Sequence, residues 1–150
     1  MDRYLHPPLT GFPFVLLSCV MALELSAAIL KKEELGRMAR FLLGVACLVT
    51  PLTFFSGYFA AEYASQTFQV AQDRIAEHQA AGKLLLLSLI PTFVFSSLRK
   101  SQASPRVVQC LFFVSLSCSL YLVLLTSSRG GDLVFRHGAG VFAKPPAESE

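Results

Sequence analysis

The chain has 150 residues, of which 53% are hydrophobic, and its mean hydropathy is +0.54. A soluble domain of this length does not need so much apolar surface to fill one core, so the composition indicates an integral membrane protein. The formal charge is only +3, and the basic residues gather in short segments rather than along an aromatic-rich face. This distribution gives no support to nucleic-acid binding.

The first membrane span is predicted from Gly11 to Leu30, a stretch of 20 residues that contains one charge, Glu24. This length matches the ~20 residues that a bilayer core requires. The two prolines that follow His6 are expected to keep this histidine out of any helix, because proline restricts the backbone of the residue before it. Thr10 is the expected N-cap of the span.

Three further spans are predicted, at about 41–61, 76–98 and 107–125. A tight charged connection, 31–40, joins the first span to the second, and the run Ser-Ser-Arg-Gly-Gly at 127–131 is expected to stop the last helix. Short connections force neighbouring helices to run in opposite directions. The sequence therefore predicts a single all-α domain over 1–150, an antiparallel four-helix membrane bundle with both termini on one side.

The orientation follows from the basic residues of the loops. The segments 31–40 and 99–106 hold four and three Lys or Arg, which is seven of the 13 in the chain. Loops dense in Lys and Arg stay in the cytoplasm. The expected location is a bacterial inner membrane, crossed several times, with both termini in the periplasm.

The three histidines of the chain should lie at the same membrane face, because even numbers of spans separate His6, His78 and His137. Neutral imidazole is the commonest metal ligand in proteins, and two imidazoles can hold the iron of a b-type haem at the polar edge of a bilayer. A direct copper or zinc site of all three histidines is one alternative. The other is a cofactor-free accessory subunit, because polar residues collect at membrane edges in any case.

His78 is the first choice of ligand, because it alone lies on a helix continuous with a span. His6 is the expected second ligand, and His137 is left to bond a propionate or a quinone. Three arginines within four residues of a histidine, namely Arg3, Arg74 and Arg136, are candidate partners of the propionates. Gly82, four residues after His78, would leave room for a flat macrocycle, although glycine at such a place is equally a helix-packing device.

Glu24 is a separate signal, an intramembrane acid roughly 20 Å below Thr10 at ~1.5 Å per residue. An unpaired carboxylate at that depth costs at least ~2.5 kcal/mol, so the side chain is expected to face the bundle. A role in proton or quinone chemistry, a carboxyl bonded by neighbouring serines, and a contact to a partner subunit stay open. The four cysteines lie inside apolar runs and are expected to be small core residues.

No nucleophile motif, phosphate-binding loop, nucleotide fingerprint or redox Cys-x-x-Cys occurs in the chain. The sequence therefore favours an electron-transfer or accessory subunit over a stand-alone enzyme. Since no soluble domain is predicted, we expect its partners to be the lipid bilayer and larger membrane or periplasmic subunits of a redox complex.

Three segments together carry a resemblance. They are the opening His-Pro-Pro-Leu-Thr-Gly-Phe-Pro-Phe, the run Ala-Glu-His-Gln-Ala-Ala-Gly that ends at Gly82, and the closing Gly-Gly-Asp-Leu-Val-Phe-Arg-His-Gly-Ala-Gly-Val. In this order they resemble the bacterial membrane-protein family known as domain of unknown function 2231. The family pattern has an acidic residue late in span one, usually Asp where this chain has Glu24. Some members are joined to, or encoded beside, Rieske-type or c-type cytochrome domains, so the resemblance implies membrane electron transfer.

Overall fold

A computed structural model describes residues 6–68, 70–99 and 105–140 of the chain. The described part is helical and contains no strand. Its helices are α1 (His6–Leu9), α2 (Gly11–Leu30), α3 (Glu33–Phe68), α4 (Gln72–Leu98) and α5 (Arg106–Phe135). The four long helices are each long and apolar enough to cross a membrane. The all-α four-helix bundle expected from the sequence is therefore confirmed.

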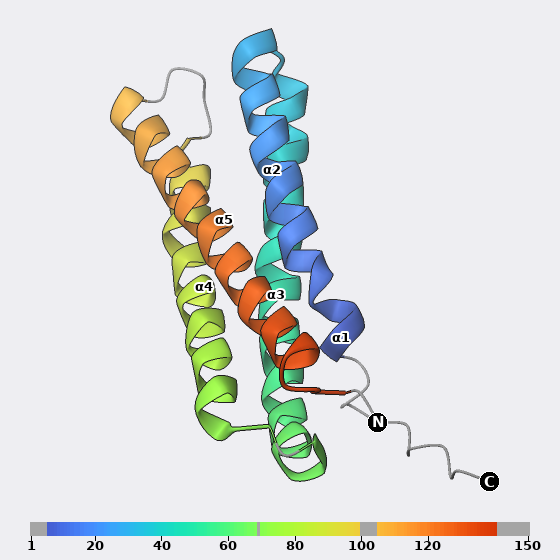
Figure 1. Cartoon of the computed structure of the whole chain (residues 1–150). Helices are drawn as coiled ribbons and strands as arrows, with labels where there is room; N and C mark the ends of the chain where they lie inside the picture. The colour runs from blue at the N-terminus through green and yellow to red at the C-terminus, as the bar shows by residue number, and fades with distance from the viewer. Residues whose placement is uncertain (1–5, 69, 100–104, 141–150) are drawn as a thin grey trace, which may run out of the picture.

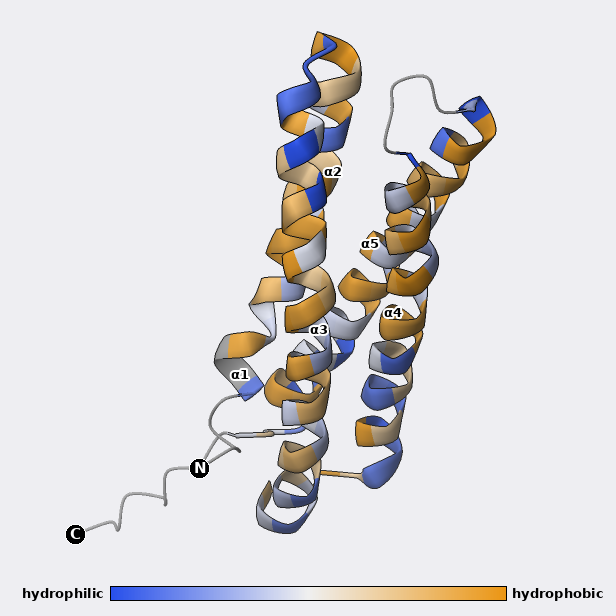
Figure 2. Cartoon of the chain, turned by 180° about the vertical axis from the view of Figure 1, so that it is seen from behind, coloured by the Kyte–Doolittle hydropathy of each residue, from blue (hydrophilic) through white to orange (hydrophobic). Residues whose placement is uncertain are grey.

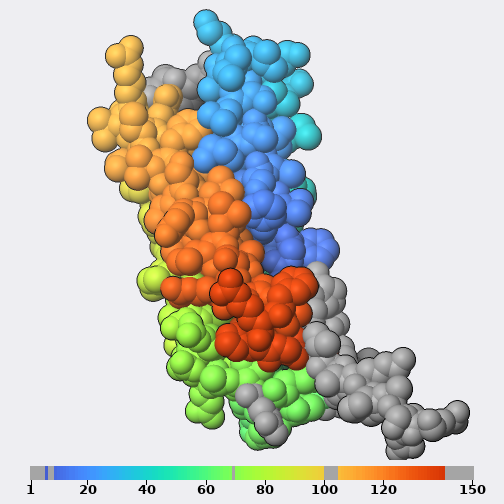
Figure 3. All heavy atoms as spheres, viewed as in Figure 1, coloured from blue at the N-terminus to red at the C-terminus, as the bar shows by residue number. Residues whose placement is uncertain are grey.

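The bundle consists of two helical hairpins (Figure 1). α2 packs extensively against α3, and α4 packs still more extensively against α5. The hairpins meet through smaller α3–α4 and α2–α5 contacts. Figure 3 shows the face on which α2 and α5 lie side by side. The backbones of α2 and α4 do not touch within the described chain, so these two helices lie diagonally across the bundle.

The outer surface of the bundle is apolar over most of its length. Hydrophobic residues dominate the middle of every long helix, while hydrophilic residues gather toward both ends (Figure 2). Large side chains such as Phe41, Leu48 and Val114 are more than two-thirds exposed. A surface of this kind is stable only against lipid or other protein.

Small and aliphatic side chains fill the centre, where Leu17, Leu43 and Leu116 are fully buried with Phe112. The predicted core placement of the cysteines is wrong for three of the four. Cys19, Cys110 and Cys118 are exposed on the outer surface and Cys47 is half-buried. Each helix of a four-helix bundle turns only one face to the centre, so an apolar residue on another face stays outside.

α2 has the bounds predicted for the first span, whereas α3, α4 and α5 are longer than predicted and two expected breaks are absent. α3 begins at Glu33, so residues 33–40 are helical rather than a connection; acidic side chains at an N-terminus favour this early start. α5 continues through the expected stop at 127–131 and ends at Phe135. The backbone turns instead at Gly138 and Gly140, whose φ angles of 68° and 82° suit glycine.

The start of the chain also differs from its prediction. His6 is the first residue of the four-residue helix α1 rather than a residue outside any helix. Prolines are tolerated in a first helical turn, because the N–H groups that they lack would have no partner there. Thr10 does precede α2, but its backbone is helical and its side chain makes no capping hydrogen bond.

Candidate functional site

Two histidines meet where the start of α2, the second half of α3, the start of α4 and the end of α5 come together, toward one end of the bundle (Figure 1). The ring centroids of His6 and His78 are 6.3 Å apart, and the ring planes cross at 76°. Both side chains are half-buried. The pair joins segments 72 residues apart in the chain and bridges the diagonal between the first hairpin and α4.

His6 is held by the middle of α3. Its Nδ1 lies 3.2 Å from the carbonyl oxygen of Thr53 and 3.0 Å from the Oγ of Ser56. The Ser56 hydroxyl also lies 2.7 Å from the Thr53 carbonyl oxygen, and a hydroxyl can both donate and accept. Because a carbonyl oxygen can only accept, the Thr53 contact favours a ring hydrogen on Nδ1.

His78 is held in the same way by α5. Its Nδ1 lies 3.1 Å from the carbonyl oxygen of Thr126, which can only accept a hydrogen bond. This contact too favours a ring hydrogen on Nδ1. Neither Nε2 has a hydrogen-bond partner among the described residues, so each ring has one nitrogen anchored and one nitrogen available.

This arrangement is typical of histidines that bind metals. A ligating imidazole almost always donates its second ring N–H to a carbonyl or carboxylate, which fixes the ring and its tautomer. Burial lowers the pKa of His6 below its ordinary value of 6.5, and the hydrogen bond to Thr53 offsets only part of this effect. His6 is therefore neutral at pH 7, the state that a metal ligand requires.

Glycines lie directly beside both rings. A Cβ atom on Gly57 would lie 2.5 Å from Cε1 of His6, and one on Gly130 would lie 3.1 Å from Cε1 of His78. Ordinary side chains do not fit these two positions without movement of the imidazoles. Sequence analysis missed both glycines and the two threonines that hold the rings; the signal available was a threonine followed four residues later by a glycine, in α3 and again in α5.

The third histidine has a different environment. His137 follows α5, and its Nε2 lies 3.9 Å from the carboxylate of Asp132, which also pairs with Arg136 at 3.0 Å. Within the described residues, no group of three His, Cys, Asp or Glu side chains is arranged to hold a metal ion. The structure thus brings two of the three predicted histidines together as a pair and gives the third a carboxylate partner.

Two of the three arginines predicted to serve a propionate, Arg74 and Arg136, form ion pairs on their own segments. Arg74 pairs with Glu77 on its own helix at 3.4 Å, with half of its side chain exposed, and Arg3 lies outside the described residues. Arg129, which sequence analysis did not select, donates a 2.8 Å hydrogen bond to the carbonyl of Glu77, the residue before His78. A cationic group therefore does lie beside the pair, and it comes from α5.

Gly82 has a packing role. A Cβ atom at this position would lie 3.1 Å from the ring of Phe54, so the space beside the glycine is taken by an aromatic side chain of α3. This contact matches the helix-packing alternative for Gly82 rather than the provision of room for a macrocycle.

Glu24 faces the bundle, as predicted, but its partner was not foreseen. The carboxylate is buried and forms an ion pair with Arg99, which follows α4 and is also largely buried. The guanidinium of Arg99 stacks over Phe112 at 4.2 Å from the ring centroid. Arg99 was expected to be a loop charge at the membrane surface; it instead turns into the bundle, because the buried acid and the aromatic face of α5 together compensate its desolvation.

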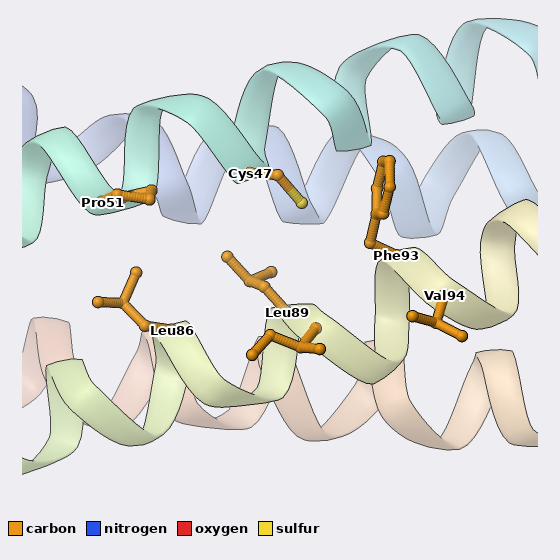
Figure 4. A pocket seen from close by; sticks show the side chains of 7 residues that line it. Cys47, Pro51, Leu86, Leu89, Phe93 and Val94 are labelled. Carbon is orange, nitrogen blue, oxygen red and sulfur yellow. The ribbon is translucent and has the colours of Figure 1, made fainter.

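An apolar groove of about 400 Å³ separates α3 from α4 in the middle of the bundle. Figure 4 shows Cys47 and Pro51 on one side and Leu86, Leu89, Phe93 and Val94 on the other. No charged side chain lines it. The groove lies at one of the two interfaces between the hairpins, and its lining is almost entirely apolar.

Comparison with known proteins identifies the family of this chain. The family model described as predicted membrane protein, DUF2231, matches residues 3–143. The chain belongs to the DUF2231 family. No curated protein and no solved structure matches it. Membership of DUF2231 agrees with the four membrane-spanning helices, and the family description names no activity.

Proposed function

We propose that this DUF2231 protein is a small integral membrane subunit of a redox complex that holds a b-type haem between His6 and His78. The observation that carries the proposal is the pairing itself: two imidazoles from distant segments, each anchored through Nδ1 to a backbone carbonyl, with both Nε2 atoms available. An imidazole nitrogen binds a metal at about 2 Å, so two ligands of one metal are about 4 Å apart. Ring centroids 6.3 Å apart are compatible with such a pair.

Five residues of the chain would hold and orient the haem. His6 and His78 would bind the iron, and the Thr53 and Thr126 carbonyls would orient the rings. Arg129 is the nearby cation suited to a propionate, because its guanidinium already reaches the residue before His78. The haem would supply one-electron chemistry, whose potential depends on the ligands and on the surrounding dielectric.

The second candidate is a cofactor-free accessory subunit. The rings of His6 and His78 contact one another edge to face, and such a contact also stabilises a bundle without any metal. A copper or zinc site of all three histidines has less support, because His137 is paired with Asp132 and no three-ligand group occurs in the described part.

The deciding experiment is an absorption spectrum of the full chain purified in mild detergent from a host that makes haem. We expect a Soret band in the wild type, its loss in His6→Ala and in His78→Ala, and its retention in His137→Ala. Bound metal without a Soret band would favour the metal-site alternative. A protein with no Soret band and no bound metal would favour the accessory subunit. Full haem retention in His78→Ala would overturn the assignment. The same preparation from the native host should contain the larger subunits that exchange electrons with this chain.

A further inference from the structure

The two hairpins present their histidines by the same device. The Nδ1 contact joins His6 to Thr53 over 47 residues and His78 to Thr126 over 48 residues. In both hairpins the threonine hydroxyl donates back to the carbonyl four residues earlier, at 3.0 Å in α3 and 2.7 Å in α5. In both, the residue four places after the threonine is a glycine that lies against the imidazole.

Helix geometry explains why the glycine comes four residues after the carbonyl. A helical side chain leans toward the N-terminus and covers the turn that precedes it, so residue i+4 lies over the carbonyl of residue i. That carbonyl already accepts the N–H of residue i+4, and its second lone pair can accept a side-chain donor; at Thr53 the Ser56 hydroxyl reaches the same oxygen. A residue i+4 without a side chain leaves room for a donor as wide as an imidazole to approach this lone pair.

We propose that Gly57 and Gly130 are positioning residues, which open the Thr53 and Thr126 carbonyls to His6 and His78 and thereby hold both rings as Nδ1–H tautomers with Nε2 available for a ligand. The two hairpins are, on this basis, equivalent histidine-presenting units brought face to face. The inference deepens the proposed haem site and rests on it for the identity of the ligand. The tautomers themselves are a property of the protein alone.

The two units differ in how tightly the glycine is packed. A Cβ atom would be 2.5 Å from His6 but 3.1 Å from His78, so alanine at Gly57 must displace the ring, whereas alanine at Gly130 requires a shift of only a few tenths of an ångström. The chain also offers matched controls. A Cβ atom on Gly44, in the same helix as Gly57, meets nothing within 4 Å, and one on Gly131, next to Gly130, comes no closer than 3.9 Å to Phe135.

The test is ¹⁵N NMR of the histidine side chains in the full chain, reconstituted in lipid nanodiscs after any bound chromophore has been extracted. In the wild type we expect His6 and His78 to show a protonated Nδ1 and a bare Nε2, the less common tautomer of a free side chain. Gly57→Ala should move His6 away from this pattern, Gly130→Ala should perturb His78 to a smaller extent, and Gly44→Ala and Gly131→Ala should leave both unchanged.

Two results would overturn the inference: wild-type rings protonated on Nε2, or Gly57→Ala with the His6 tautomer intact. The wild-type spectrum decides the first point even if a variant fails to fold. Where haem is bound, loss of this anchoring should weaken binding about 10–100-fold in Gly57→Ala, as for other residues that orient a metal ligand. Correct tautomers in a protein that never binds haem would refute the proposed function and leave the positioning role standing.

Discussion

At the scale of single residues, the site depends on small groups that free backbone oxygens for side chains. Thr53 and Thr126 contribute carbonyls, Ser56 contributes a hydroxyl, and the two glycines contribute the absence of a side chain. None of these residues has reactive chemistry of its own. Their effect is to fix which nitrogen of each imidazole carries hydrogen, and this decides what the imidazole can bind.

The buried state of His6 predicts a loss of stability in acid. Its pKa is lower in the folded protein than the ordinary 6.5, so the unfolded chain binds more protons as the pH falls below that value. The stabilisation is complete above pH 6.5 and decreases as the pH is lowered from there. For one group the slope cannot exceed about 1.4 kcal/mol per pH unit.

Unfolding of the chain in detergent at pH 8 and at pH 5 measures this effect. His6→Gln removes the titrating group, so the wild type should lose more free energy of unfolding between the two pH values than the variant does. Equal losses in the two proteins would mean that the His6 imidazole is not desolvated in the fold.

At the scale of elements, α2 and α4 are joined by side chains rather than by backbone packing. The histidine pair links α1, just before α2, to α4 at one end of the bundle. The Glu24–Arg99 pair links α2 to the residue after α4 in the other half, with Phe112 of α5 beneath the guanidinium. Two polar bridges thus cross a diagonal that the helices themselves do not close.

The ion pair should be costly to break from one side. We expect Glu24→Leu to destabilise the bundle by about 3–5 kcal/mol, because it leaves the buried Arg99 charge without a partner. Arg99→Leu should cost a similar amount, since Glu24 has one buried carboxylate oxygen without a hydrogen-bond partner even in the intact pair. The measurement is the free energy of unfolding in mixed detergent.

The double variant Glu24→Leu with Arg99→Leu is the matched control for this ion pair. It removes both charges and should recover most of the lost stability, because apolar side chains of similar volume can replace a buried ion pair. Additive losses in the double variant would show that the two side chains act independently.

At the scale of the whole molecule, the bundle has two chemically different ends. The histidine end carries the paired imidazoles and Asp132 with its neighbours Arg136 and His137. The other end carries the last residues of α2 and α4 and the first residues of α3 and α5. The described basic residues of segments 31–40 and 99–106 belong to that second end; they are Lys31, Lys32, Arg37, Arg40, Arg99 and Arg106. An electron-transfer role at the periplasmic surface requires the histidine end to face outward.

We expect a reporter fused after residue 150 to be active in the periplasm, because loops dense in Lys and Arg are retained in the cytoplasm. The Arg99 side chain is buried with Glu24, so the remaining basic residues of the two loops must supply the bias. Replacing Lys31 and Lys32 with Gln should weaken it. A fusion that is active only in the cytoplasm would reverse the topology and place the histidines on the wrong side for a periplasmic electron donor or acceptor.

The sequence by itself determined the membrane class, the four spans and the presence of three histidines at one end. These features depend on local composition: the length of an apolar run decides whether a segment spans, and an even number of spans returns the chain to the same face. Helix ends were predicted less well. The glycines at 130 and 131 were expected to stop α5, but glycine is also tolerated inside a helix when a neighbouring ring packs against it, as His78 does.

Only the tertiary structure decided which of these residues meet. It paired His6 with His78, gave His137 a carboxylate, and drew Arg99 from a loop to Glu24 in the bundle. The contact between His137 and Asp132 is local. The other two join segments of different hairpins, so the distance between the two side chains depends on how the hairpins pack. Periodicity along the chain carries no information on that packing, because every residue has a carbonyl. Which carbonyl a histidine reaches depends on the facing helix and on the space that a glycine leaves beside it.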